Sequence, residues 1–331
     1  MFHSPWYTGL GLALIIALSG CGGDEGVGDP VQDHTAYALQ SAFDVQSDFG
    51  DSGLGSVLNM LKDMSDHPDD PGRYVIEQIV DALPVPISWA AEPFIGSLGK
   101  EINALIYEVA PTAADDAKAL AEGLSQAARQ FELHSNLEVG LDAEDRFTGK
   151  HALQSVTYRY QGRSLTVTAA ELGDNAKATV RIPVQIEGDL LTIPEHRLQL
   201  PIGTLLDKTL DAVVVPSVVE DLSSFAAVID RWFACTRVAA MVSGVIGAGD
   251  AEVLSACLKG SGSVSSKLHD KLLALDKDGA LRLHGTATAN ANGSDYQGSG
   301  WSGRYIVGKD AAADLDPQRC PFSAQKQAAS R

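Results

Sequence analysis

Hydrophobic positions follow a helical period between residues 74 and 130. Apolar side chains recur every three or four residues from Ile76 to Leu83, which predicts a helix that ends at Pro84. A second helix is predicted over Phe94–Val109, and an alanine-rich third helix is predicted to begin after Thr112. We therefore expect the N-terminal part of the folded region to be helical.

The period changes from helical to alternating after Phe131. The clearest alternation of apolar and polar residues runs from Val180 to Ile186 and is typical of a half-buried strand. The connections are too short for crossovers, so residues 132–200 predict an antiparallel meander of four or five strands. The alternation changes parity at Pro194-Glu195-His196, which predicts a β-bulge that bends the sheet.

Residues 203–275 return to a helical pattern. Between Val218 and Ile246 only a narrow stripe is polar, which predicts a helix that is buried on most sides. The segment Gly244–Asp250 is expected to turn this helix into a partner helix. The last pattern is a strand pair over residues 281–307 with a turn near residues 292–294.

This order of elements predicts an α+β fold. It comprises a helical N-terminal region, a curved antiparallel β-meander, a buried apolar helix hairpin and a C-terminal β-hairpin. We expect residues 73–308 to form one globular domain, with the apolar helix packed against the concave face of the sheet. The polar composition of residues 309–331 predicts a mobile tail.

The first residues have the pattern of an export signal. The apolar run Leu10–Leu18 is too short to span a bilayer and is followed by small residues, as in a signal peptide. The tetrapeptide Leu18-Ser19-Gly20-Cys21 resembles the lipobox of bacterial lipoproteins. The resemblance implies that residues 1–20 are removed, that Cys21 carries the lipid and that Gly22 directs the protein to the outer membrane. The alternative is a soluble export signal with a chance cysteine.

Charge is distributed unevenly along the chain. The formal net charge of −18 argues against binding to nucleic acid, which depends on clustered Lys and Arg. Residues 24–70 hold eleven acidic side chains and one lysine. We therefore expect residues 21–72 to be an acidic, flexible tether between the lipid anchor and the domain. The alternative is a divalent-cation site among these acidic residues, although their spacing matches no calcium-binding loop.

Three cysteines follow the lipobox, and an exported protein meets an oxidising compartment. Cys235 lies eight residues before Ser243, and Cys257 lies seven residues after Asp250. An antiparallel helix hairpin would place these two cysteines side by side, which predicts a disulfide. Cys320 is then left over, and a bond to either helix cysteine, a free thiol or an intermolecular link all stay open for it.

The sequence lacks the motifs of nucleophile elbows, phosphate-binding loops, dinucleotide sites and zinc sites. The histidines have no metal-ligand spacing, and we expect no cofactor. Glu195 and His196 at the predicted bulge form the one candidate pair of acid and base.

Three functions fit these observations. The first is a non-catalytic, lipid-anchored envelope protein that binds a lipid-like or other hydrophobic ligand. Its candidate ligand contacts are the wall residues Phe225, Ile229, Trp232 and Phe233, with Trp301 at a mouth. The same apolar pattern also marks an ordinary core, so the second function is a structural or partner-binding envelope lipoprotein with a filled core. The third is a hydrolase around Glu195 and His196.

Overall fold

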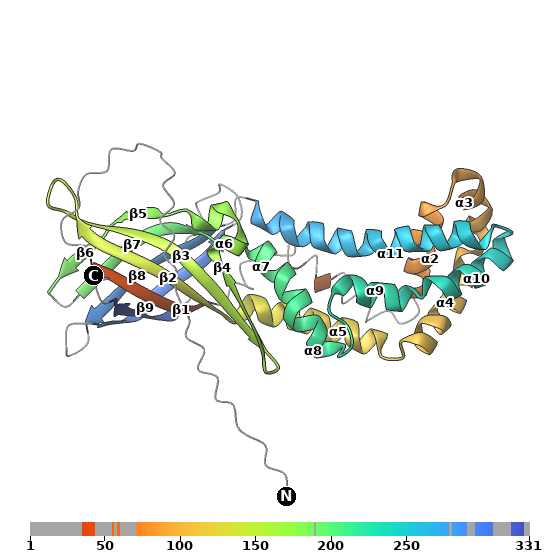
Figure 1. Ribbon diagram of the computed structural model, residues 1–331, viewed down its shortest axis with the longest axis horizontal. Helices are drawn as coiled ribbons and strands as arrows, with labels where there is room; N and C mark the ends of the chain where they lie inside the picture. Colours follow the sequence, from red (N-terminus) through yellow and green to blue (C-terminus); the bar gives the residue numbers. More distant parts are fainter. Residues whose placement is uncertain are drawn as a thin grey trace, which may run out of the picture. The chain divides into compact units, whose positions relative to one another are not determined.

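The computed structural model describes residues 35–43, 55, 58–59, 71–188, 190–277, 280–289, 295–306 and 319–327. All of them belong to one compact unit, Val31–Arg331. This unit combines one antiparallel sheet with a set of helices, so the predicted α+β class is confirmed (Figure 1). The predicted signal peptide, the tetrapeptide that resembles a lipobox and most of the acidic segment lie outside the described residues.

Ten strands form the described sheet, in the order β4-β3-β2-β1-β10-β9-β8-β7-β6, and β5 pairs with β3 next to β4. The strands are β1 Thr35–Phe43, β2 Phe131–Leu141, β3 Phe147–Tyr160, β4 Arg163–Thr168, β5 Val180–Pro183, β6 Gln185–Glu187, β7 Leu190–Gln199, β8 Ala280–Ala289, β9 Asp295–Ile306 and β10 Arg319–Lys326. Every pairing is antiparallel.

The middle of the sheet is made by two strands from opposite ends of the chain. β1 pairs with β2 on one side and with β10 on the other. The tether prediction is therefore wrong for Thr35–Phe43, and the tail prediction is wrong for Arg319–Lys326. Tyr37, Leu39 and Phe43 alternate with exposed residues and are buried, which explains why this short segment joins the sheet.

Several predicted features of the strands are confirmed. Hairpins join β3 to β4, β6 to β7 and β8 to β9. The register of β7 against β8 shifts between Ile193 and His196, where the bulge was predicted. The simple meander is wrong, because β4 does not continue into a paired β5. A short helix α6, Ala169–Leu172, and a 3-10 turn, Asp174–Lys177, return the chain to the far half of β3.

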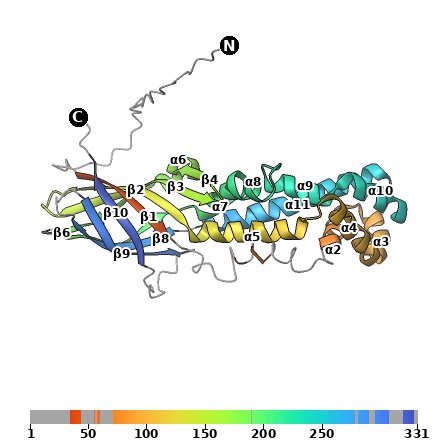
Figure 2. The same cartoon turned by 90° about the horizontal axis from the view of Figure 1, so that it is seen from below.

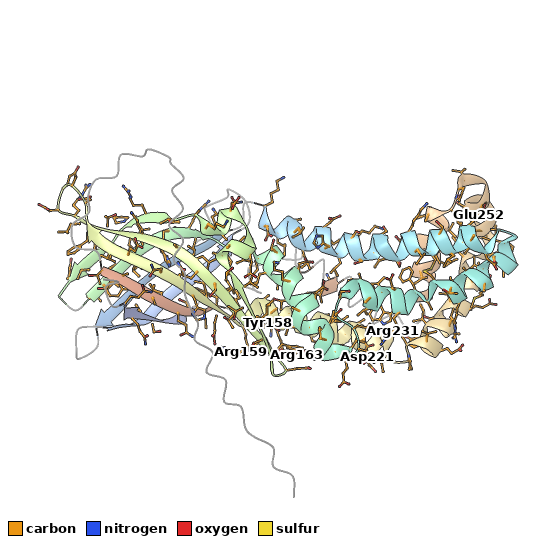
Figure 3. All side chains as sticks on the ribbon, viewed as in Figure 1. Tyr158, Arg159, Arg163, Asp221, Arg231 and Glu252 are labelled. Atoms are coloured by element: carbon orange, nitrogen blue, oxygen red, sulfur yellow. A yellow bond between two sulfur atoms is a disulfide. The ribbon has the colours of Figure 1, made fainter. Side chains whose placement is uncertain are left out.

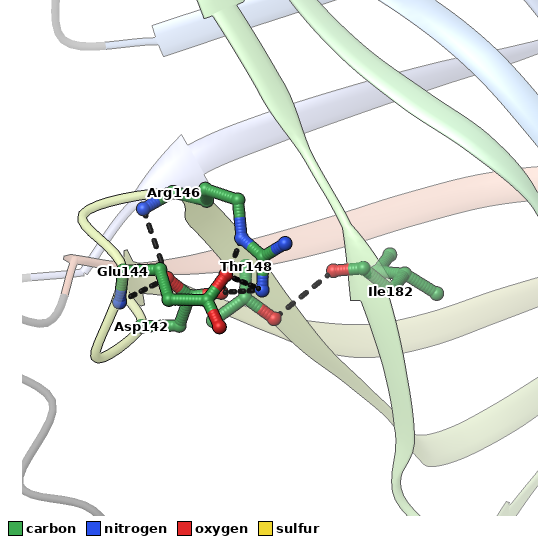
Figure 4. Close-up of polar contacts among 5 residues, drawn as sticks. All are labelled: Asp142, Glu144, Arg146, Thr148 and Ile182. Atoms are coloured by element: carbon green, nitrogen blue, oxygen red, sulfur yellow. Dashed lines mark hydrogen bonds and ion pairs between the residues drawn. The ribbon is translucent and has the colours of Figure 1, made fainter.

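The β2–β3 hairpin is closed by one carboxylate (Figure 4). Asp142 accepts hydrogen bonds from the backbone amides of Glu144 and Arg146, both at 2.9 Å, and from the Arg146 side chain at 3.0 Å. These bonds, led by the one from the Arg146 amide, lower the pKa of Asp142. Nearby, the Thr148 hydroxyl donates to the Ile182 carbonyl at 3.3 Å, which ties β3 to β5.

The helices are α2 Pro71–Ala82, α3 Val85–Ala91, α4 Ile95–Val109, α5 Ala113–Arg129, α7 Ile202–Thr209, α8 Val215–Val218, α9 Phe225–Phe233, α10 Cys235–Ile246 and α11 Asp250–Leu273. Three single turns, η2 Glu92–Phe94, η4 Leu210–Val214 and η5 Ala274–Asp276, extend α3, α7 and α11. The helices pack mainly on one another, α2 on α4 and α11, and α9 and α10 on α11 (Figure 2).

The predicted long apolar helix over residues 218–246 is broken twice. α8 ends at Val218, and α9 begins only after Ser224, whose side chain accepts a hydrogen bond from the Ala227 amide. Ala234 then adopts a left-handed conformation, φ 42°, between α9 and α10. The main neighbours of α9 are α11 and α4, so the expectation that this segment covers the concave face of the sheet is wrong.

Contact between sheet and helices is concentrated at β3. Tyr158, which Figure 3 labels at the helical end of the sheet, donates a hydrogen bond from its hydroxyl to the Gly123 carbonyl in α5, at 3.1 Å. A Cβ atom at Gly123 would lie 2.4 Å from the Val214 side chain in η4, so only glycine lets α5 come this close to η4. Within the described residues, no helix has both the length and the apolar character needed to cross a membrane.

Candidate functional site

A chain of hydrogen bonds crosses the buried side of the sheet and links β2, β3 and β7. Ser135 Oγ lies 2.7 Å from His151 Nε2, and His151 Nδ1 lies 2.7 Å from His196 Nε2. His196 Nδ1 lies 2.9 Å from the Pro194 carbonyl oxygen. The four ring nitrogens therefore all have partners. The three side chains are 3, 0 and 7 % exposed, in this order along the chain of bonds.

Two register shifts lie next to these side chains. The β2–β3 register shifts between His134 and Ser135, and the β7–β8 register shifts between Ile193 and His196. A bulge adds one residue to a strand and changes which side chains face the interior. In β7 the bulge turns His196 toward the interior and leaves Glu195 exposed. Ser135 keeps the regular alternation of β2, because the extra residue of the other bulge, Gln154, lies in β3.

The histidine pair joins strands that do not pair with each other. β3 and β7 lie far apart in the order of the sheet, and β5 contacts both of them. The His151–His196 contact connects β3 directly to β7, with ring centroids 4.9 Å apart. It therefore ties two parts of the sheet that no backbone ladder connects directly.

Burial holds both imidazoles in the neutral form. It lowers the pKa of His151 to about 3, with a smaller contribution from His196. Burial also lowers the pKa of His196, against opposing effects of the Pro194 carbonyl and the Glu195 charge.

The hydrogen bonds from Ser135 to Pro194 all run in one direction, because both rings are neutral and the last acceptor is a carbonyl. The Pro194 carbonyl can only accept, so His196 Nδ1 carries a hydrogen and Nε2 of the same ring accepts. His151 Nδ1 then donates to His196, and His151 Nε2 accepts from the Ser135 hydroxyl. A serine hydroxyl that donates to an imidazole, itself oriented by a further group, is the arrangement used for nucleophilic catalysis.

The sequence identified one member of this site. His196 was predicted through the parity change at the bulge. Its expected partner Glu195 is exposed, and the charge of Glu195 opposes the lowering of the His196 pKa. Ser135 and His151 were missed. The available signal was a polar residue at an inward position of an otherwise apolar strand face, and several serines and histidines share that property.

The candidate ligand residues of α9 lie together in the helical core. Phe225, Ile229, Trp232 and Phe233 are between 0 and 3 % exposed. Trp232 and Phe233 line a cavity of about 20 Å³ together with residues of α2, α4 and α5, namely Val75, Ile106, Tyr107, Ala113 and Ala114. A buried water needs roughly 10–15 Å³ of such space, so the cavity has room for about one water. The side chain of Trp301, on β9, lies outside the described residues.

The predicted disulfide is present. Cys235 at the start of α10 is bonded to Cys257 in α11, with Cα atoms 5.5 Å apart. The turn between the two helices falls at residues 247–249, as the spacing of the cysteines required. The backbone of Cys320 lies in β10 opposite Trp301, and its side chain is outside the described residues.

Among the residues that the structure describes, no group of three or more His, Cys, Asp and Glu side chains is placed to hold a metal ion. No family model, no curated protein and no solved structure matches the chain. Its function is therefore argued from its own residues and geometry.

Proposed function

We propose that this chain is a lipid-anchored protein of a bacterial outer membrane that acts by binding another envelope protein at its surface. The observation that carries this choice is the close packing around the candidate ligand residues of α9. Pockets that enclose small molecules measure about 300–1,000 Å³, whereas the cavity beside Trp232 and Phe233 measures about 20 Å³. An acyl chain does not fit there, which favours partner binding over storage of a hydrophobic ligand.

Exposed apolar side chains support a surface role. Val85 and Leu258 are 58 and 54 % exposed, and Phe94 and Val245 are also exposed. They lie on α3, η2, α10 and α11, and these elements contact one another in sequence from η2 through α3 and α10 to α11. Large apolar residues that gather on neighbouring elements are typical of surfaces that meet another protein.

The choice between partner and ligand can be tested on the protein purified from membranes. We expect organic extraction and mass spectrometry to find no stoichiometric non-covalent lipid, and no binding of a fluorescent fatty acid. A photo-cross-linking residue at Val85 or Leu258 should give a discrete adduct with an envelope protein in cells. The same residue at exposed Arg163, in the β3–β4 hairpin, is the control and should give none. Stoichiometric lipid, or equal adducts from all three positions, would contradict the proposal.

The anchor is proposed from the lipobox and has its own test. Cells grown with an alkyne analogue of palmitate should label the wild-type chain and release it only with detergent. Cys21→Ser should remove the label and the membrane association, while Cys320→Ser should keep both. Label that persists in Cys21→Ser would show that the lipid is not on this residue.

A further inference from the structure

We propose that the sheet holds an acyl-ester hydrolase site, with Ser135 as nucleophile, His151 as its base and His196 as the residue that positions His151. This inference concerns a different part of the molecule from the partner surface and does not depend on it. Its basis is the chain of 2.7, 2.7 and 2.9 Å contacts that runs from Ser135 to the Pro194 carbonyl.

The described residues that pair directly with Ser135 and His151 are apolar, so packing alone does not require polar side chains there. On the buried face Ser135 lies opposite Leu39 of β1 and Leu153 of β3, and His151 lies opposite Leu137. Polar groups in such an interior carry a desolvation cost, which an all-apolar lining would avoid. β7 also departs from regular pairing, and its bulge turns His196 toward His151. Departures of this kind from local regularity concentrate at functional sites.

The direction of the hydrogen bonds suits acyl transfer. Ser135 Oγ forms a bond to the carbonyl carbon of an ester, and its proton passes to His151 Nε2. The bond from that carbon to the alcohol oxygen breaks, and His151 Nε2 returns the proton to the leaving alcohol. Water then attacks the acyl-serine with the same imidazole as base, which releases the carboxylic acid and restores the Ser135 hydroxyl.

His196 acts on this reaction through His151. Its Nε2 accepts from His151 Nδ1, which keeps Nε2 of His151 free of hydrogen and directed at Ser135. Nδ1 of His151 keeps this acceptor when Nε2 takes up the serine proton, so the ring holds its orientation through the step. The Pro194 carbonyl fixes His196 in the required tautomer, because a carbonyl accepts only from a protonated Nδ1.

The lining selects the class of substrate. Leu39 and Leu153 flank Ser135, so the acyl group that fits beside it is small and uncharged, as in a short-chain ester. Ser135 is 3 % exposed, and such a substrate reaches it by local opening of the strands. The register shift next to Ser135 interrupts the β2–β3 ladder there, and an interrupted ladder is where we expect the strands to open.

The test uses a fluorophosphonate probe on the full purified chain, followed by peptide mapping. We expect one phosphonylated residue per chain, at Ser135, and hydrolysis of p-nitrophenyl butyrate. Ser135→Ala should lose the label and reduce turnover at least about 100-fold, as loss of a serine nucleophile does. Ser41→Ala is the matched control, because Ser41 is equally buried on the same side of neighbouring β1. It should keep both label and turnover.

The positioning role of His196 is tested by measurements that a purely structural role would leave unchanged. We expect His196→Leu to lower kcat with little change in KM and to shift the pH profile of turnover, and His196→Gln to restore part of kcat. A folded wild-type chain that takes up no label would overturn the proposal and identify the three residues as a structural network. Label at another residue would overturn it as well. The wild-type result decides the matter even if Ser135→Ala fails to fold.

Discussion

His151 and His196 make the stability of the sheet depend on pH. Both have pKa values below the ordinary 6.5 because the charged form is poorly solvated in the interior. The unfolded chain takes up protons below pH 6.5, while the folded chain resists them. The stabilisation is therefore complete above pH 6.5 and is lost progressively as the pH falls toward about 3 for His151. Each titrating histidine contributes a slope of about 1.4 kcal/mol per pH unit.

Urea unfolding at pH 7 and at pH 5 checks this behaviour. We expect the free energy of unfolding of the wild type to fall between the two values, and that of His151→Phe to fall less. At pH 7 the variant should be about 1–3 kcal/mol less stable, because Ser135 and His196 lose a partner. His134→Phe is the control, since His134 is half-buried on the other side of β2, and it should keep the wild-type pH dependence. If the free energy of unfolding of His151→Phe falls as much as that of the wild type, the pH dependence comes from other groups.

The sequence predicted one of these residues for a physical reason. A bulge changes the parity of apolar positions, and that change is visible at Pro194-Glu195-His196 without any partner. Ser135 and His151 lie 16 residues apart, and His151 and His196 lie 45 residues apart. No local pattern reports which remote side chains meet, so the hydrogen-bonded chain could not be predicted.

The first turn of α7 is fixed by the end of α11. Asp276 accepts hydrogen bonds from the backbone amides of Gly203 and Thr204, at 2.5 and 2.8 Å, and from the Thr204 hydroxyl at 2.6 Å. The carboxylate thus caps a helix that lies more than 70 residues before it. The close approach leaves no room at Gly203, where a Cβ atom would lie 2.0 Å from the Leu272 carbonyl oxygen.

Two glycine substitutions separate this contact from helix propensity. Gly203→Ala should lower the free energy of unfolding by about 1–3 kcal/mol or more, since backbone must move to admit the methyl group. Gly262→Ala is the control, because it lies within α11 with open space around it. It should raise stability by up to about 1 kcal/mol. Equal effects in denaturant titrations would show that α7 and α11 do not press together here.

The disulfide stabilises the α10–α11 hairpin by restricting the unfolded chain. It closes a segment of 22 residues, for which loop-closure entropy gives about 3 kcal/mol. Cys235→Ala together with Cys257→Ala should lose about this amount in urea titrations under oxidising conditions. Adding a reductant should then lower the free energy of unfolding of the wild type but not that of the double variant. Cys320→Ser should behave as the wild type unless Cys320 has a partner of its own.

The whole sheet depends on both ends of the chain. β10 pairs with β1 and β9, so its removal leaves two strands in the middle of the sheet without a shared neighbour. A chain that ends at residue 318 should lose cooperative thermal unfolding, measured by circular dichroism, and become insoluble. A chain that ends at residue 327 keeps β10 and should unfold like the full chain. Cooperative unfolding of the shorter chain would show that the sheet tolerates the gap.

The sequence by itself determined the alternation of helical and extended regions, the bulge at His196, the hairpins and the Cys235–Cys257 bond. All of these depend on the period of apolar residues or on short separations along the chain, which each segment carries locally. Only the tertiary structure decided that Thr35–Phe43 and Arg319–Lys326 lie side by side, that α9 packs among helices, and that Ser135 meets His151. These outcomes depend on contacts between segments that are remote in sequence. There the free energy gained by burying side chains outweighs the structural preference that each segment has by itself.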